Sequence, residues 1–194
     1  MRQSFAETWR LIRADIDWRC LYERKKRSPL TRLRLMFHPG SATVVLFRWQ
    51  RFFDTNHLGF LATICRWLNL ILFTSSYSSG ADVAGGFLVV HATAVCVDEG
   101  VVIGPRCILF AQNAISRSPF VDGKPNAPSG VPIVDSDVVF GIGASAHGAI
   151  RIGRGCHIGM NTLVDFSAVP GSTLLGVPAR VIWQNPNPPS VHNS

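Results

Sequence analysis

Charged residues are scarce in this sequence: Asp, Glu, Lys and Arg make up 16% of its 194 residues, whereas hydrophobic residues make up 47%. Intrinsically disordered chains have the opposite balance, so this composition excludes disorder except at the ends. It also indicates that the chain buries surface in contacts between subunits. At roughly 150 residues per domain, the length allows one domain with a modest appendage.

Paired cysteines are also absent. The five cysteines lie far apart and no two form a CxxC pair, which excludes a disulfide framework and a cysteine zinc cluster. The first ten residues lack the charged-then-apolar pattern and the small-residue cleavage site of a secretory signal, so we expect that no leader is removed. Together these features predict a reduced, cytoplasmic protein.

A hydrophobic run long enough to cross a membrane is missing as well. The one candidate, residues 58–73, is interrupted by Arg66 and Asn69. A bilayer span needs about 20 apolar residues. The sequence therefore predicts no membrane span and favours a buried or interfacial helix at this place.

The net charge of +7 comes mostly from residues 1–34, which hold ten Lys or Arg against four Asp or Glu. The basic cluster at residues 24–27 has no interleaved aromatic residues and matches no nucleic-acid-binding motif, so we expect no nucleic-acid partner. Two interpretations of this cluster remain. It is a solvated helix end or loop, or it binds an anionic ligand such as a phosphate or a membrane surface.

The hydrophobic pattern divides the chain into two parts. In residues 1–73, apolar residues recur at spacings of three and four, and the runs at 44–53 and 58–73 are nearly free of turn residues. This pattern predicts an α-helical N-terminal region of three or four helices. The last residues, 184–194, are rich in Pro and Asn, and we expect a flexible tail there.

Between these parts, residues 74–183 follow a period of six. A grid of apolar residues recurs at this spacing, often followed by Gly or Asp. Neither a helix nor a half-buried strand has this period, whereas a solenoid of short strands and tight corners does, with one side chain per hexad in a narrow core. The residues of the grid are Val97, Ile103, Leu109, Ile115, Val134, Phe140, Ala146, Ile152, Ile158 and Val164.

Two breaks interrupt the hexads, and breaks in a regular scaffold are common places for function. The first falls between residues 80 and 97, where the phase slips around Val90, His91, Ala92 and Thr93. The second is residues 116–131, rich in Pro, Gly and Ser, which we expect to form an extruded loop able to reach a neighbouring subunit.

Two groups of motifs resemble known families. Residues 176–182 (GVPARVI), preceded by IRIGRGCHIGMNTLV, resemble the hexapeptide-repeat acyltransferases, which fold as left-handed parallel β-helices. More narrowly, VVHATAVCVDEGVVIG, the helical N-terminal region and the segment RADIDWR resemble the serine acetyltransferase family. The resemblance implies an α+β fold, with N-terminal helices followed by the β-helix. It also implies a cytoplasmic homotrimer or dimer of trimers that takes acetyl-CoA in a groove between adjacent β-helices.

The same resemblance implies roles for single residues. His91 matches the family's general base, and Asp15 matches an N-terminal aspartate that helps hold the serine substrate. Val90 stands where the family has an aspartate, Val131 where it has a second histidine, and Ser76 where it has the aspartate that orients the imidazole. Because valines replace a charged or titratable residue at positions 90 and 131, the sequence predicts an acceptor other than, or in addition to, free serine. The structural alternative is that His91 merely fills an irregular corner.

For CoA, the candidates lie on the later hexads. They are Gly141, Ile142, Gly159 and Met160, with Arg180 available to a phosphate. The glycines have an equally good structural reason to be there. His147 and His157 occupy different columns of the hexad grid, so we expect no metal site.

These observations predict an acyl-CoA-dependent acyltransferase, most plainly an acetyltransferase, acting on a small hydroxyl- or amine-bearing acceptor. A thioester is already activated, so a base near the acceptor and a channel that positions both substrates can suffice. The alternative is a catalytically degenerate β-helix that serves as a scaffold or regulatory partner of an acetyltransferase. A CoA-binding measurement distinguishes the acyltransferase from the scaffold, because a scaffold has no need to bind CoA.

Overall fold

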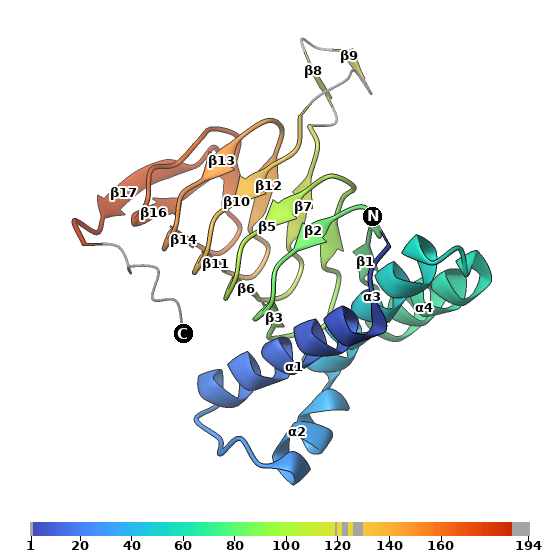
Figure 1. Ribbon diagram of the computed structural model, residues 1–194. Coiled ribbons are helices and arrows are strands. Elements are labelled where there is room, and N and C mark those ends of the chain that lie inside the picture. The colour runs from blue at the N-terminus through green and yellow to red at the C-terminus, as the bar shows by residue number, and fades with distance from the viewer. Residues whose placement is uncertain (1, 119, 122–123, 126–129, 188–194) are drawn as a thin grey trace.

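The computed structural model describes residues 2–118, 120–121, 124–125 and 130–187. Four helices lie at one end of a stack of β-coils, and the coils continue away from the helices toward the C-terminus (Figure 1). The helices are α1 (Phe5–Tyr22), α2 (Pro29–Met36), α3 (Pro39–Thr55) and α4 (Gly59–Phe73). This order confirms the predicted α+β fold.

Local sequence explains where the helices begin. The side chain of Ser4 accepts a hydrogen bond from the backbone N–H of Glu7, and Ser28 does the same for Thr31 at the start of α2. Such N-caps satisfy backbone donors that have no partner inside the helix. Proline occupies the first turn of both α2 and α3, where its missing N–H costs no hydrogen bond.

The strands form three mainly parallel sheets, so each full coil of the chain visits all three. Sheet A holds β1 (Ser76–Tyr77), β4 (Cys96–Val97), β7 (Ala114–Ser116), β12 (Ser145–His147) and β15 (Leu163–Val164). Sheet B holds β2 (Asp82–Val83), β5 (Val102–Ile103), β10 (Ile133–Val134) and β13 (Arg151–Ile152). Sheet C holds β3 (Leu88–Val89), β6 (Ile108–Leu109), β11 (Val139–Phe140), β14 (His157–Ile158), β16 (Ser172–Leu175) and β17 (Arg180–Gln184). Within sheet C, β16 and β17 pair antiparallel.

The register of the sheets confirms the six-residue period. Val134 pairs with Ile152, Phe140 with Ile158 and Ala146 with Val164, each partner lying 18 residues further along. Three hexads therefore make one coil, one hexad for each sheet. All ten residues of the predicted grid are buried, as a narrow solenoid core requires.

The first break in the six-residue spacing covers fewer residues than the sequence predicted. Tyr77, Val83 and Val89 already follow the six-residue spacing and are buried, so the hexads begin before residue 80. Val89 pairs with Leu109, 20 residues later. The two extra residues fall in the segment 90–95, which joins β3 to β4.

The second break is a long insertion into one coil. Ile115 pairs with Ala146, 31 residues later, and the additional chain lies between β7 and β10. It contains the antiparallel hairpin of β8 (Phe120–Val121) and β9 (Lys124–Pro125), which projects from the β-helix (Figure 1). At the other end, β17 runs to Gln184, one residue past the predicted boundary at 183. Most of the expected tail, residues 188–194, lies outside the described residues.

Helix α4 packs against α3 and leaves most of its apolar surface open. Its buried residues, Ala62, Cys65 and Asn69, lie on one face of the helix. None of the helices in the described part of the chain is long and apolar enough to cross a membrane. The large apolar side chains of α4 that remain exposed are Phe60, Leu61, Ile64, Trp67, Leu68, Leu70, Ile71 and Leu72.

Candidate functional site

The segments that join sheet C to sheet A stack into one edge of the β-helix, which we name the C–A corner. It consists of residues 90–95, 110–113, 141–144 and 159–162 on four successive coils. Backbone hydrogen bonds link each segment to the next, from Gln112 N to Thr93 O, Gly143 N to Ala111 O and Asn161 N to Ile142 O. The structure thus brings five predicted site residues to one edge: His91, Gly141, Ile142, Gly159 and Met160.

His91 lies in the two-residue expansion of this corner and is exposed. Its ring faces that of Phe110 on the next coil, with ring centroids 6.2 Å apart. In the described part of the chain, no residue hydrogen-bonds the imidazole. The preceding Val90 is half-buried, and Ser76 lies on β1 with its side chain exposed. The imidazole is therefore accessible to a bound molecule, and no carboxylate among the described residues orients it.

Helices α1 and α3 pack against the first segment of the C–A corner. Arg19 of α1 is buried, donates a hydrogen bond to the carbonyl oxygen of Val89, and pairs with Glu23. At Gly40 of α3, an added Cβ would lie 2.8 Å from the carbonyl oxygen of Val90, closer than atoms pack. Only glycine lets α3 approach this backbone so closely. The helices thus fix the backbone on which His91 is mounted.

The CoA candidates divide into two kinds. A Cβ at Gly141 would lie 2.9 Å from the backbone nitrogen of Met160, so coil stacking itself requires this glycine. A Cβ at Gly159 would instead meet the end of the Leu175 side chain. Ile142 and Met160 instead point outward, with 38% and 69% of their surface exposed. Arg180 follows the hairpin turn that closes the same corner, and it is exposed. The exposed side chains are the ones able to contact a cofactor.

Asp15, which the sequence predicts to help hold an acceptor, is buried. It is 4% exposed, and its carboxylate accepts hydrogen bonds from Arg48 Nε at 2.9 Å, Arg48 Nη2 at 3.2 Å and the backbone N–H of Phe87 at 2.8 Å. Burial raises the pKa of the Asp15 carboxyl, and the charge of Arg48 opposes this shift. Both oxygens thus accept hydrogen bonds within the chain, and Asp15 joins α1 to α3; its predicted contact with an acceptor stays a prediction.

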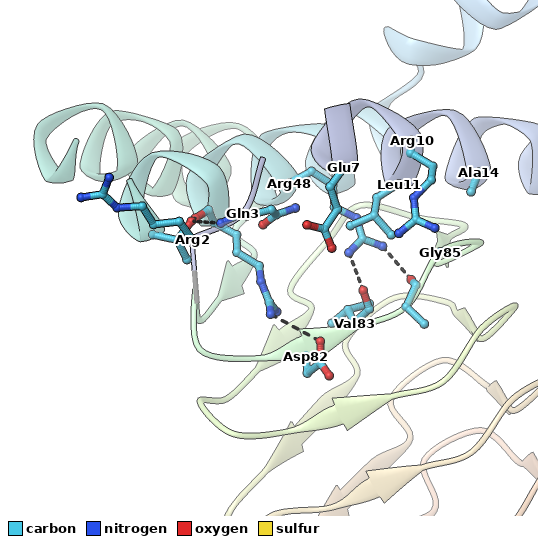
Figure 2. A pocket seen from close by; sticks show the side chains of 13 residues that line it. Arg2, Gln3, Glu7, Arg10, Leu11, Ala14, Arg48, Asp82, Val83 and Gly85 are labelled. Carbon is cyan, nitrogen blue, oxygen red and sulfur yellow. Dashed lines mark hydrogen bonds and ion pairs between the residues drawn. The ribbon is translucent and has the colours of Figure 1, made fainter. Parts of the chain in front are cut away.

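Arg48 extends this junction to the first coil. It also donates hydrogen bonds to the carbonyl oxygens of Val83 and Ala84, at 2.6 and 2.7 Å (Figure 2). A cavity of about 500 Å³ opens beside it, between the start of α1, α3 and β2. Figure 2 shows arginine and acidic side chains around this cavity. None of the residues predicted to act in catalysis or CoA binding lines it.

Val131 lies at a different edge of the β-helix from His91. It is half-buried where sheet A turns into sheet B, and a Cβ at Gly100 would be 3.4 Å from Val131 Cγ2. His91 lies at the opposite end of the sheet A strands. Within one chain, the structure therefore does not bring Val131 and His91 together.

His147 has a role that the sequence did not indicate. Its Nδ1 lies 2.6 Å from the hydroxyl oxygen of Ser116, which begins the inserted loop. Burial lowers the pKa of His147. This contact fastens the base of the loop to sheet A. Among the described residues, no cluster of three His, Cys, Asp or Glu side chains is arranged to hold a metal ion.

Comparisons with known proteins point to one family. A serine acetyltransferase of Mycobacterium tuberculosis is 30% identical over 179 residues, which cover 91% of this chain and 75% of the relative. A serine acetyltransferase of Synechococcus elongatus is 24% identical over 169 residues, covering 87% and 67%. No protein-family model matches the chain.

Solved structures confirm the fold. The serine acetyltransferase of Neisseria gonorrhoeae superposes with a TM-score of 0.78 at 24% identity, covering 94% of this chain and 68% of that one. A serine acetyltransferase in complex with CoA superposes with a TM-score of 0.78 at 22% identity, covering 93% and 72%. At these identities the likeness shows the fold alone, a left-handed parallel β-helix after N-terminal helices, as the sequence predicted.

Proposed function

Since this chain belongs to the serine acetyltransferase family, we propose that it transfers an acetyl group from acetyl-CoA to a hydroxyl or amine of a small acceptor. The observation that carries this proposal is the C–A corner, which places exposed His91 on the same edge as Ile142 and Met160. The β-helix, residues 74–183, carries the reaction, and the helical region, residues 1–73, supports its first coil.

The reaction requires one base. His91 accepts the proton of the acceptor hydroxyl while the acceptor oxygen attacks the carbonyl carbon of the thioester. The carbon–sulfur bond then breaks, and the CoA sulfur leaves with a proton returned by the imidazolium. A positioned base of this kind contributes roughly 10²–10⁴-fold to the rate. Because no carboxylate in the described part of the chain orients the imidazole, we expect the transfer to be slower but still to occur.

Acetyl-CoA is proposed to lie along the C–A corner. Ile142 and Met160 offer apolar surface to its pantetheine arm, and Arg180 at the end of the corner offers a guanidinium to a phosphate. A structural neighbour of this chain is a serine acetyltransferase solved in complex with CoA, which supports CoA as the carrier. The competing function, a scaffold without catalysis, predicts no CoA binding.

We expect serine to be a poor acceptor. Val90 beside His91 is apolar and half-buried, and Asp15 is held by Arg48, so neither offers a charge to the small zwitterion. Each missing charged hydrogen bond costs roughly 1.5–3 kcal/mol of binding. Steady-state kcat/KM values across hydroxyl- and amine-bearing acceptors test this, with serine expected below a bulkier acceptor. If serine gives the highest kcat/KM, the apolar Val90 does not determine which acceptor is preferred.

We further propose that the protein assembles as a homotrimer or a dimer of trimers. The exposed apolar face of α4 needs a partner, and Val131 and His91 can line one acceptor site only if they come from two adjacent subunits. Analytical ultracentrifugation at micromolar concentration is expected to show three or six chains per particle. A stable monomer would contradict this assembly, because a monomer has no groove between subunits.

A further inference from the structure

A cavity of about 320 Å³ opens between the end of α1 and helix α2. It is lined by Lys25, Thr31, Arg34, Leu35, Phe37 and His38. Three of these six side chains are basic residues and none is acidic. Leu35 and Phe37 add an apolar wall, and 78% of the surface of Phe37 is exposed.

The positive charge of this cavity is only partly neutralised within the chain. Lys25 pairs with Glu23 at 2.6 Å, and the other oxygen of Glu23 accepts from Arg19 at 3.0 Å. An ammonium has three donors, so Lys25 keeps donors for a further partner. Arg34 is exposed and has no acidic partner within the described part of the chain. A guanidinium of this kind matches the geometry of a carboxylate or a phosphate.

The cavity and His91 are joined by short connections. The side chain of His38 accepts a hydrogen bond from the backbone N–H of Gly40 at 3.3 Å, and Gly40 packs directly on the backbone of Val90. On the other side, Arg19 reaches from the Glu23–Lys25 pair to the carbonyl oxygen of Val89. Two lining residues, His38 and Lys25, are therefore connected through neighbouring residues to the backbone just before His91.

The cavity is lined by residues of the helical region alone, whereas the proposed CoA path follows the later coils. The helices lie beside the first coil, whereas β6, β11 and β14 follow on the later coils, away from the helices (Figure 1). Phe110, Ile142 and Met160 come soon after these three strands. A CoA molecule that runs along the C–A corner would leave the helical side of His91 free for the acceptor.

From this arrangement we propose that the cavity binds an anionic group, a carboxylate or a phosphate, on an acceptor whose hydroxyl or amine reaches His91. Arg34 and Lys25 hold the anion, and Phe37 contacts the body of the acceptor. The inference rests on the proposed function and specifies its substrate class. It also gives Lys25, one residue of the basic cluster at 24–27, an anionic partner.

The test uses acceptor pairs that differ by one anionic group: glucuronate against glucose, and glycerol 3-phosphate against glycerol. CoA release is measured for the full-length protein and for the variants Lys25→Gln and Arg34→Gln. Lys26→Gln and Arg27→Gln are matched controls, because they remove a charge from the same region without lining the cavity. The two pairs distinguish a carboxylate site from a phosphate site.

We expect the anionic member of at least one pair to react with at least tenfold higher kcat/KM. Arg34→Gln should raise KM for that member about tenfold, with kcat and the affinity for CoA unchanged, while the controls stay within twofold. Equal reaction of both members in each pair would overturn the inference. So would a loss of CoA affinity in Arg34→Gln, because the cavity would then hold a CoA phosphate.

A binding measurement separates this inference from the proposed function. Glucuronate and inorganic phosphate are titrated while the NMR signals of the His38 ring are followed. If none of these four acceptors releases CoA, the titration alone decides about the cavity. Saturable shifts that disappear in Arg34→Gln support an anion site, and the absence of shifts with both anions overturns it.

Discussion

Replacement of His91 by alanine is expected to lower kcat by roughly 10²–10⁴-fold, the loss typical of a general base. The affinity for CoA should stay nearly unchanged, because the imidazole lies at one end of the proposed CoA path and CoA contacts the later coils. Steady-state rates of CoA release, together with calorimetric titration of CoA, measure the two effects separately.

His157→Ala is the matched control. His157 is also an exposed histidine, but it lies on β14 of sheet C rather than at the C–A corner. Its removal should leave kcat within about twofold of the original value. Full turnover in His91→Ala would end its assignment as the base and favour the structural alternative, a histidine that fills an irregular corner.

The second large effect concerns stability. Arg48→Met is expected to lower the free energy of unfolding by about 3–5 kcal/mol, because it leaves the buried carboxylate of Asp15 without its partner. The change also removes the donors to the carbonyl oxygens of Val83 and Ala84. Urea denaturation followed by circular dichroism measures the loss.

An exposed ion pair supplies the control. Arg151 pairs with Asp135 at 2.8 Å, with 65% of the arginine side chain exposed. Arg151→Met should cost at most about 1 kcal/mol, as exposed pairs do. If the two variants lose equal stability, the Asp15–Arg48 pair does not hold the helices to the β-helix. The same account expects Asp15→Asn to change stability and to leave the KM of the acceptor unchanged.

The β-helix could be predicted from the sequence because its rule is local. Each coil needs three core side chains six residues apart, and the grid from Val134 to Val164 keeps this spacing without interruption. Tyr77, Val83 and Val89 obey the same rule. They were harder to recognise because two extra residues at 90–95 shift their phase relative to the rest.

The site could be predicted only in part, because its geometry depends on contacts that are distant in sequence. The C–A corner follows from the hexads, and with it the common edge of His91, Ile142 and Met160. The partner of Asp15 does not follow, since Arg48 lies 33 residues away on another helix, one of many arginines in this region. The cavity between α1 and α2 likewise depends on how α2 packs against α1 and α3.

The central claim is that acetyl-CoA and His91 meet at the C–A corner. The most direct measurement is a crystal structure of the full-length protein with CoA. The account predicts the CoA sulfur beside the His91 imidazole, with the pantetheine arm along Ile142 and Met160. CoA bound at another edge of the β-helix, or no CoA bound at millimolar concentration, would contradict it.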